Sequence, residues 1–336
     1  FAGVPPFGKR ADVLHPRTAP GIDRLIVIAD DAEVAIGAGE ELQEGGEPRA
    51  NRQPQTMPAE DRERKATTRP APVLLRRMKW EKLEGLPEKQ VHLQRQTMPM
   101  QQAQAYAGVV MAAQHEEADL GSMLRAIHNM RQISLHPRID GGLSDDDFIA
   151  MSARLQVAFS RLDEIATRGE RVLIFVEYLS FQPLLQGILQ RRYHLEQPPM
   201  IINGTVTGDR RKAMVDRFQD GSGFDAMILS PRAGGLGLTL TSANHVLHLS
   251  RWWNPAVEDQ CTDRIYRIGQ TRPIHVHLPL AVHPQFGESS FDECLNALLE
   301  RKRSLSREVL GLAVVRESAS DVEELFGGTV GGGYGP

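Results

Sequence analysis

Short apolar runs alternate with amphipathic stretches through the second half of the chain. The apolar runs predict β-strands, which lie at Val172–Val176, Met200–Asn203, Ala226–Ser230, His245–Leu249 and Ile274–Leu278. Apolar residues at helical spacing between them predict α-helices at about 148–168, 178–192, 208–219, 255–267 and 288–310. Strands that alternate with amphipathic helices indicate an α/β fold, in which helices cover both faces of a parallel sheet through right-handed crossovers.

The first half of the chain is uneven. It has one early apolar run, Leu25–Ala29, whereas residues 37–72 are rich in Gly, Pro, Gln and charge. Such a stretch buries too little surface to offset its ordering entropy, so we expect a linker or an exposed loop. Helical periodicity then covers about 101–118 and 120–135. A Gly-Gly and acidic segment, Gly141–Asp147, separates these helices from the alternating half.

Composition and charge narrow the classes to which the chain can belong. Its 336 residues are 41% hydrophobic and 24% charged, which is typical of one large or two modest globular domains. No apolar run reaches the roughly 18 residues that cross a bilayer, and no signal-peptide pattern begins the chain, so we expect a cytoplasmic protein with no membrane partner. Two cysteines, Cys261 and Cys294, argue against a disulfide framework. A net charge of −4 still permits a local basic groove.

A glycine-rich turn follows the predicted strand Ala226–Ser230. Gly234, Gly235 and Gly237 would let the backbone approach a ligand, and N–H groups there could cradle an anion. The alternative is a tight turn that needs positive φ, which accounts for about half of such clusters.

Two arginines and a glutamine lie on the predicted helix at 255–267. Arg264 and Arg267 are three residues apart and Gln260 lies four before Arg264, so the three side chains would share one face. Two guanidiniums on one face repel each other unless an anion lies between them, and phosphate suits their forked donors. Taken alone, a solvated face with salt bridges is favoured by about two to one.

Two tryptophans follow the predicted strand His245–Leu249. Trp252 and Trp253 are not both expected to be buried, so one would anchor the core while the other offers its face to a base, a sugar or a loop. Packing of an exposed tryptophan against its own chain is the alternative.

Histidines lie on two of the predicted strands. His275 and His277 alternate and point to the same side, and His245 and His248 lie on the neighbouring strand. No metal-site spacing accompanies them, so ordinary sheet-face histidines are favoured by roughly nine to one, and we expect no metal site.

Several segments together resemble the C-terminal RecA-like lobe of the Swi/Snf-type family of superfamily 2 ATPases, which are double-stranded DNA translocases related to helicases. Motifs V and VI of that family match SPRAGGLGLTLTSANHVLHLSRWWNPAVEDQCTDRIYRIGQTRPIHVH, with a Trp-Trp-Asn-Pro element between the two motifs. The other matching segments are RVLIFVEY (motif IV), NGTVTGDRRKAMVDRFQ (the segment after it), LLRRMKWEKLEGLPEKQVHL and LRAIHNMRQISLHP (the inter-lobe region and helical protrusions) and FDECLNALLERKRSLSREVLG (the bracing helix).

The resemblance covers about residues 73–312 and implies a P-loop NTPase-like second lobe with a RecA-like parallel sheet. It divides the chain into a partly disordered remnant or insertion at 1–72, an inter-lobe helical region at 73–147, the lobe itself at 148–312 and a flexible tail at 313–336.

In this family ATP lies between two RecA-like lobes. The resemblance implies that Arg264 and Arg267 are arginine fingers that reach the γ-phosphate, while Gln260 helps to position them. The residues that would shape the backbone near the nucleotide are Gly234, Gly235 and Gly237.

The resemblance also implies contacts to the backbone of double-stranded DNA, independent of base sequence. Ser230 and Arg232 would face phosphates; the family usually has Lys in place of Arg232, and Pro231 is a looser match. Trp252 and Trp253 would lie near the DNA-tracking face. Arg210 and Arg211 would either contact the DNA backbone or form a solvated helix start. Arg76 and Arg77 would be either phosphate contacts or structural braces.

The sequence contains neither a Gly-x-x-x-x-Gly-Lys-Ser/Thr loop nor an Asp-Glu-x-His/Gln magnesium motif. Asp30 and Asp31 follow an apolar run without a phosphate loop and are interpreted as an acidic turn. ATP and Mg²⁺ would therefore be bound mainly by an N-terminal lobe that this chain lacks, and the chain alone is expected to be inactive. Its first residue, Phe1, fits a fragment of a longer protein.

These observations predict the C-terminal motor lobe of an ATP-dependent DNA translocase, with an unidentified target. The compact motif layout favours a bacterial origin. The alternative is a non-hydrolysing module that keeps the fold to dock nucleic acid or protein, and an RNA helicase lobe is a weaker third. An upstream phosphate loop in the same gene would favour the motor.

Overall fold

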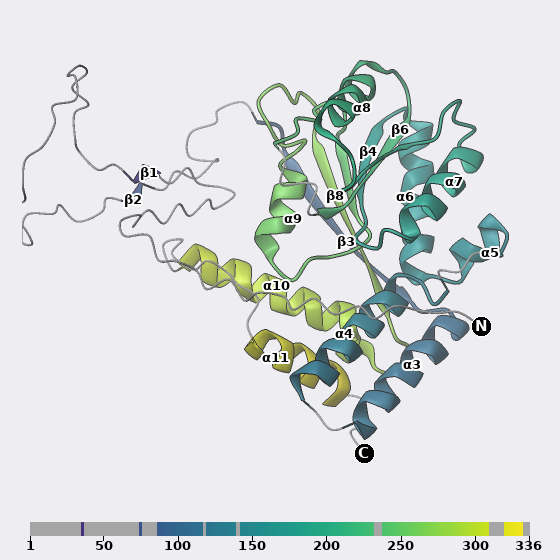
Figure 1. Cartoon of the computed structure of the whole chain (residues 1–336), viewed down its shortest axis with the longest axis vertical. Helices are drawn as coiled ribbons and strands as arrows, with labels where there is room; N and C mark the ends of the chain where they lie inside the picture. Colours follow the sequence, from purple (N-terminus) through teal and green to yellow (C-terminus); the bar gives the residue numbers. More distant parts are fainter. Residues whose placement is uncertain are drawn as a thin grey trace, which may run out of the picture. The chain divides into compact units, whose positions relative to one another are not determined.

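The computed structural model describes residues 86–116, 119–138, 142–231, 237–308 and 319–331, together with the backbone of two short strands before them (Figure 1). The chain divides into two compact units. In the first, β1 (Ala35–Ile36) pairs antiparallel with β2 (Leu74–Leu75). The predicted disorder of 1–72 lies outside the described residues, and so does the run Leu25–Ala29. All that follows concerns the second unit.

Six parallel strands form one sheet, in the order β3-β8-β7-β4-β6-β5. The strands are β3 (Lys89–Thr97), β4 (Arg171–Phe175), β5 (Met200–Ile202), β6 (Asp225–Leu229), β7 (His245–His248) and β8 (Ile274–Val282). The last five confirm the predicted strands. Side chains of the central strand β4 are buried on both faces, which is why its sequence is a continuous apolar run and not an alternating one.

Strand β3 is a strand of this sheet that the sequence pattern missed. It pairs with β8 along its whole length, with Val91 opposite Val276. It lies at the edge of the sheet, where only part of each side chain is buried, so Lys, Gln and Arg are tolerated between its apolar residues. The first strand of the sheet therefore lies within the segment that was expected to be an inter-lobe helical region.

Helices cover both faces of the sheet (Figure 1). One face carries α6 (Ala153–Thr167) and α7 (Phe181–Arg192), which bury alternate residues of β4 such as Val172 and Ile174. The other face carries α8 (Gly208–Asp220) and α9 (Pro255–Thr262), packed on the intervening residues. The predicted helix at 148–168 is in fact two, because Ser152 interrupts α5 (Asp145–Ala150) and caps α6 by accepting the Leu155 N–H.

Four helices form a layer beside the sheet: α3 (Met100–His115), α4 (Leu120–Leu135), α10 (Phe291–Glu308) and α11 (Ala319–Val330). They share a core that includes Tyr106, Ile127 and Leu299. Helix α11 corrects the prediction of a flexible tail at 313–336, since Val322 and Leu325 are buried in this core. Burial outweighs the poor helix propensity of the glycines near its end.

No helix among the described residues is both long enough and apolar enough to cross a membrane.

Candidate functional site

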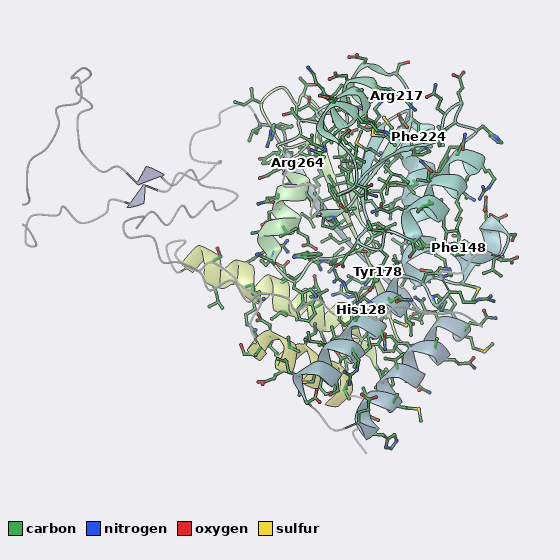
Figure 2. All side chains as sticks on the ribbon, in the orientation of Figure 1. His128, Phe148, Tyr178, Arg217, Phe224 and Arg264 are labelled. Atoms are coloured by element: carbon green, nitrogen blue, oxygen red, sulfur yellow. The ribbon has the colours of Figure 1, made fainter. Side chains whose placement is uncertain are left out.

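The predicted site residues lie toward opposite ends of the parallel strands. Ser230 and Trp252 follow the carboxyl ends of β6 and β7. Helix α9 then runs back across the sheet, so Arg264 and Arg267 come shortly before the amino end of β8. Figure 2 shows Arg264 at the end of α9 that lies away from α10. Searching only the carboxyl ends of the strands would have missed the arginines.

Helix α9 is well started but ends earlier than predicted. Asn254 caps it by accepting the Ala256 N–H at 3.0 Å, and Pro255 begins it. It ends at Thr262, so Arg264 and Arg267 lie in the turn beyond the helix, and the prediction that they share its face with Gln260 is wrong. The Arg264 N–H bonds to the carbonyl of Cys261, three residues back, which tightens the chain into turns.

This arginine turn (residues 263–267) is bonded to the loop that follows the glycine-rich segment. The Arg264 carbonyl accepts the Leu240 N–H at 2.9 Å. Arg267 Nη1 lies 3.0 Å from Thr239 Oγ1 and 3.5 Å from the Gly237 carbonyl. Gly237 has a φ of +69°, a conformation that favours glycine. The two most informative sequence motifs thus meet in space.

The two arginines differ in exposure. Arg264 is 4% exposed, whereas the Arg267 guanidinium is partly exposed and its Nε donates to the Asp263 carbonyl at 3.0 Å. Gln260 is partly exposed on α9. Arg267 is therefore the cation of this turn that an external anion could reach.

Gln270 fixes the contact between turn and loop, and the sequence analysis assigned it no role. It is 5% exposed, and its Nε2 donates to the carbonyls of Ala243 at 2.7 Å and Thr241 at 3.1 Å. Its Oε1 accepts the N–H groups of Thr271 and Arg272. Its place at the end of the Arg-Ile-Gly-Gln motif was the available signal.

Several other predicted residues can also be placed. Ser230 is 8% exposed, and its N–H donates to the Ile202 carbonyl at 3.0 Å, beside β5. Arg210 is exposed in the first turn of α8, and Arg211 is partly exposed with its Nη2 bonded to the Val206 carbonyl. The remaining candidates lie outside the described residues: Arg76, Arg77, Arg232, Gly234 and Gly235.

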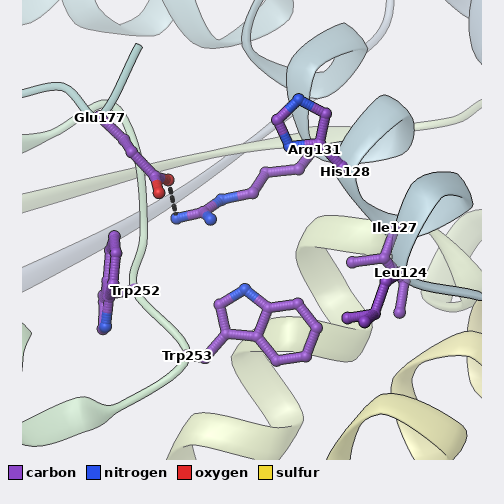
Figure 3. Close-up of a pocket in the computed structure, with 7 residues that line it drawn as sticks. All are labelled: Leu124, Ile127, His128, Arg131, Glu177, Trp252 and Trp253. Atoms are coloured by element: carbon purple, nitrogen blue, oxygen red, sulfur yellow. Dashed lines mark ion pairs between the residues drawn. The ribbon is translucent and has the colours of Figure 1, made fainter. Parts of the chain in front are cut away.

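A pocket of about 230 Å³ lies at the carboxyl ends of β4 and β7 (Figure 3). From β4 the chain goes to β5 and β6 on one side of the sheet and then to β7 and β8 on the other, so this is the switch point at which open parallel sheets often bind ligands. The lining residues are Leu124, Ile127, His128, Arg131, Glu177, Trp252 and Trp253.

The two tryptophans have different surroundings in this pocket. Trp253 packs against the helical core, whereas Trp252 faces the Arg131 guanidinium, which lies 5.4 Å from the ring centre. Arg131 also forms an ion pair with Glu177 and donates to the Arg251 carbonyl at 2.6 Å. Trp253 thus packs on the core, whereas Trp252 packs against Arg131 of its own chain, which is the alternative that the sequence analysis left open.

Four histidines gather under α6. His275 and His277 do point to the same side, where they stack with His92 and His245. His245 Nδ1 lies 3.0 Å from His277 Nε2, and its Nε2 lies 2.9 Å from Glu170 Oε2. Burial lowers the pKa of His245 to about 4 and that of His277 to about 3. Among the described residues, no three His, Cys, Asp or Glu side chains are arranged to hold a metal ion.

The chain is similar in sequence to known helicase-like proteins. Residues 157–269 match the helicase conserved C-terminal domain. The chain is 32% identical over 266 residues to YwqA of Bacillus subtilis, named as an ATP-dependent helicase/translocase, a match that covers 76% of this chain and 28% of YwqA. It is 35% identical over 272 residues to the Zorya protein ZorD of Escherichia coli O139:H28, covering 76% of this chain and 24% of ZorD.

Among solved structures, the Sulfolobus solfataricus SWI2/SNF2 ATPase core in complex with dsDNA is similar, with a TM-score of 0.56 and 26% identity. That match covers 75% of this chain and 53% of the solved one. The chain spans about a quarter of the length of the two curated relatives, at 28% and 24%.

Proposed function

Because the chain belongs to the Swi/Snf-type family of superfamily 2 helicase-like proteins, as a C-terminal RecA-like lobe, we propose that it is the second motor lobe of an ATP-dependent translocase on double-stranded DNA. In this role it would place an arginine side chain against the γ-phosphate of ATP held on an N-terminal lobe. It would also contact the DNA backbone. The single observation that carries the proposal is the bond between Arg267 and Thr239.

That bond supports a nucleotide-facing role because it positions a partly exposed cation in advance. Phosphoryl transfer is catalysed mainly by positioning and by stabilising charge, and an arginine finger contributes about 10³–10⁵ in rate. Arg267 would take this role, while the more buried Arg264 would hold the turn. Gln260 on α9 and Gly237 in the loop would border the same nucleotide.

ATP and Mg²⁺ supply the phosphoryl group and its charge-neutralising metal in this chemistry. The partly exposed guanidinium of Arg267 fits the phosphate side of such a site. As the family resemblance implies, the N-terminal lobe would provide the magnesium side of the site.

The DNA-facing part of the proposal rests on the carboxyl edge of the sheet. Arg210 is exposed at the start of α8, just beyond β5, and Ser230 follows the neighbouring strand β6. A cation beside a helix N-terminus suits phosphate contacts that ignore base sequence. Trp252 would lie at the same edge, after β7. The similar SWI2/SNF2 ATPase core was solved in complex with dsDNA, which supports DNA binding as a part of the proposal.

The experiment is Arg267→Ala in a full-length protein that carries both lobes. We expect loss of ATP hydrolysis with DNA affinity largely retained. Arg217→Ala is the control, because Arg217 is an exposed arginine that lies on α8 and not in the arginine turn. Equal loss of hydrolysis and of DNA binding in Arg267→Ala would contradict the finger role. An unchanged rate would favour the docking module.

A further inference from the structure

A buried arginine joins the Trp-Trp segment to three helices. Arg251 is 2% exposed, and its carbonyl accepts from Arg131 of α4 at 2.6 Å. Its guanidinium grips Glu258 of α9 with two bonds, Nε to Oε1 at 2.7 Å and Nη2 to Oε2 at 3.0 Å. Its Nη1 donates to Asn296 Oδ1 of α10 at 2.5 Å. The main chain directly before Trp252 is thereby tied to α4, α9 and α10.

Glu258 receives a second cation from the helical layer. Its side chain is 3% exposed, and its Oε2 also accepts from Arg303 Nη2 of α10 at 2.7 Å. Arg303 reaches Asp259 Oδ1 of α9 as well, at 3.3 Å. Burial alone would raise the pKa of Glu258, but the Arg251 and Arg303 guanidiniums hold that pKa well below its usual value. The carboxylate therefore stays charged between two cations.

The position of Glu258 on α9 makes this bonding relevant to the arginine turn. It lies four residues before Thr262, where α9 ends, which is about 6 Å along the helix axis. A short helix moves as a rigid body, so a shift or rotation at Glu258 displaces residues 263–267. The same segment is held at its far end by Thr239 and Leu240.

A buried ion pair is a weak source of net stability, because desolvating two charges offsets most of their attraction. What it does provide is a defined geometry, since a bidentate arginine–carboxylate pair fixes the relative orientation of two elements. Here those two elements are the segment that carries Trp252 and the helix that leads to Arg267.

We infer that Arg251 and Glu258 are positioning residues that couple the Trp252 segment to the arginine turn, so that contact of DNA with the carboxyl edge of the sheet sets the alignment of Arg267. Arg303 transmits the position of α10 to the same helix. This inference rests on the proposed function of Arg267. It concerns how DNA stimulates hydrolysis, and no chemical step is assigned to either residue.

The test compares two isosteric neutralisations in the full-length protein, Glu258→Gln and Asp292→Asn. Asp292 is the matched control because its carboxylate is equally buried, at 1% exposure, and is gripped by Arg154 of α6 through both oxygens. Its oxygen also accepts the Ala281 N–H at the end of β8. ATP hydrolysis is measured with and without DNA, together with DNA affinity and Tm.

We expect Glu258→Gln to lower the DNA stimulation of hydrolysis about tenfold, because a small misplacement of a catalytic group costs rate steeply. Its DNA affinity should remain within about twofold of the wild type, since phosphate contacts elsewhere carry that affinity. Asp292→Asn should lower Tm as much or more and keep the stimulation. If stimulation is normal in Glu258→Gln, or falls equally in both variants in proportion to Tm, the inference is overturned.

A milder variant covers the case in which Glu258→Gln does not fold. Arg303 is 18% exposed, so Arg303→Lys keeps the charge and loses the fork with little effect on folding. It should reduce DNA stimulation about threefold, and unchanged stimulation in Arg303→Lys would count against coupling. The two proposals fail separately: hydrolysis that survives Arg267→Ala removes the finger role, whereas the coupling alone fails if Arg267→Ala is inactive and these variants are normal.

Discussion

Arg267 Nη1 lies 3.0 Å from the hydroxyl oxygen of Thr239, although 28 residues separate the two in sequence. The bond places a partly exposed guanidinium beside the loop that follows the glycine-rich segment. It connects the arginine turn directly to the loop, so that the two motifs lie side by side. Five expectations follow from this site and from the packing around it.

The chain of residues 1–336, purified alone, should show no DNA-stimulated ATP hydrolysis. Its sequence has no phosphate loop, so the arginine turn has no bound nucleotide to stabilise. Phosphate release measured with saturating double-stranded DNA checks this. Turnover above a buffer control would contradict the assignment to a second lobe.

Replacing Thr239 by Val should slow hydrolysis in a full-length protein about tenfold, because a hydrogen bond to a charged group is worth about 1.5–3 kcal/mol. Thr239 is exposed, so Tm should change little. The matched control is Thr271→Val, at another exposed threonine near the turn. If Thr239→Val has the same kcat as Thr271→Val, the bond does not position Arg267.

Replacing Gln270 by Leu should destabilise this chain by about 3 kcal/mol. The change leaves the carbonyls of Thr241 and Ala243 and two N–H groups without their amide partner, and each buried unsatisfied group costs about 1–3 kcal/mol. Urea unfolding measures the free energy directly. Gln285→Leu, at an exposed glutamine, should stay within about 0.5 kcal/mol of the wild type. Similar values for both variants would remove the bridging role.

Acid should destabilise the sheet through the histidines under α6. The pKa of His245 falls to about 4 and that of His277 to about 3 in the folded chain, while the unfolded value is near 6.5. The unfolded state therefore binds more protons below pH 6.5, and stability is lost as pH falls from there toward 3–4. At pH 5 the loss is about 2 kcal/mol for each histidine.

Unfolding free energies at pH 7 and pH 5 test this expectation. His277→Gln should show a smaller pH dependence than the wild type, and His115→Gln, at an exposed histidine of α3, should not. A wild-type stability that does not change between these pH values would contradict the burial of neutral imidazoles.

DNA binding by this chain should fall steeply with salt and should not depend on base sequence, because phosphate contacts release counterions. Arg210→Ala should reduce the slope of log affinity against log salt by about 1. Arg161→Ala is the control, since Arg161 lies on α6, on the opposite face of the sheet, and pairs with Glu164. Fluorescence anisotropy with two unrelated duplexes gives both quantities. Salt-independent or sequence-selective binding would refute the backbone-contact model.

The pattern of apolar residues was sufficient for most elements of the fold. Five strands and most of the helices were predicted because each buries a periodic set of side chains within one short segment. Edge strand β3 was missed because its side chains are only partly buried and mixed in polarity. Helix α11 was missed because its glycines disfavour a helix that is stable only when packed on the helical core.

For the candidate site, too, some features follow from the sequence and others only from the tertiary structure. Residue types and spacing drew attention to Arg264, Arg267 and the tryptophans, but only the family resemblance gave them expected roles. They could not show that α9 stops at Thr262, because the bond between Leu240 and Arg264 replaces continued helix. The partners of Gln270 and Glu258 also depend on how distant segments cross the sheet. Local periodicity is written along the chain, whereas strand order and long-range hydrogen bonds are determined only when the whole core packs.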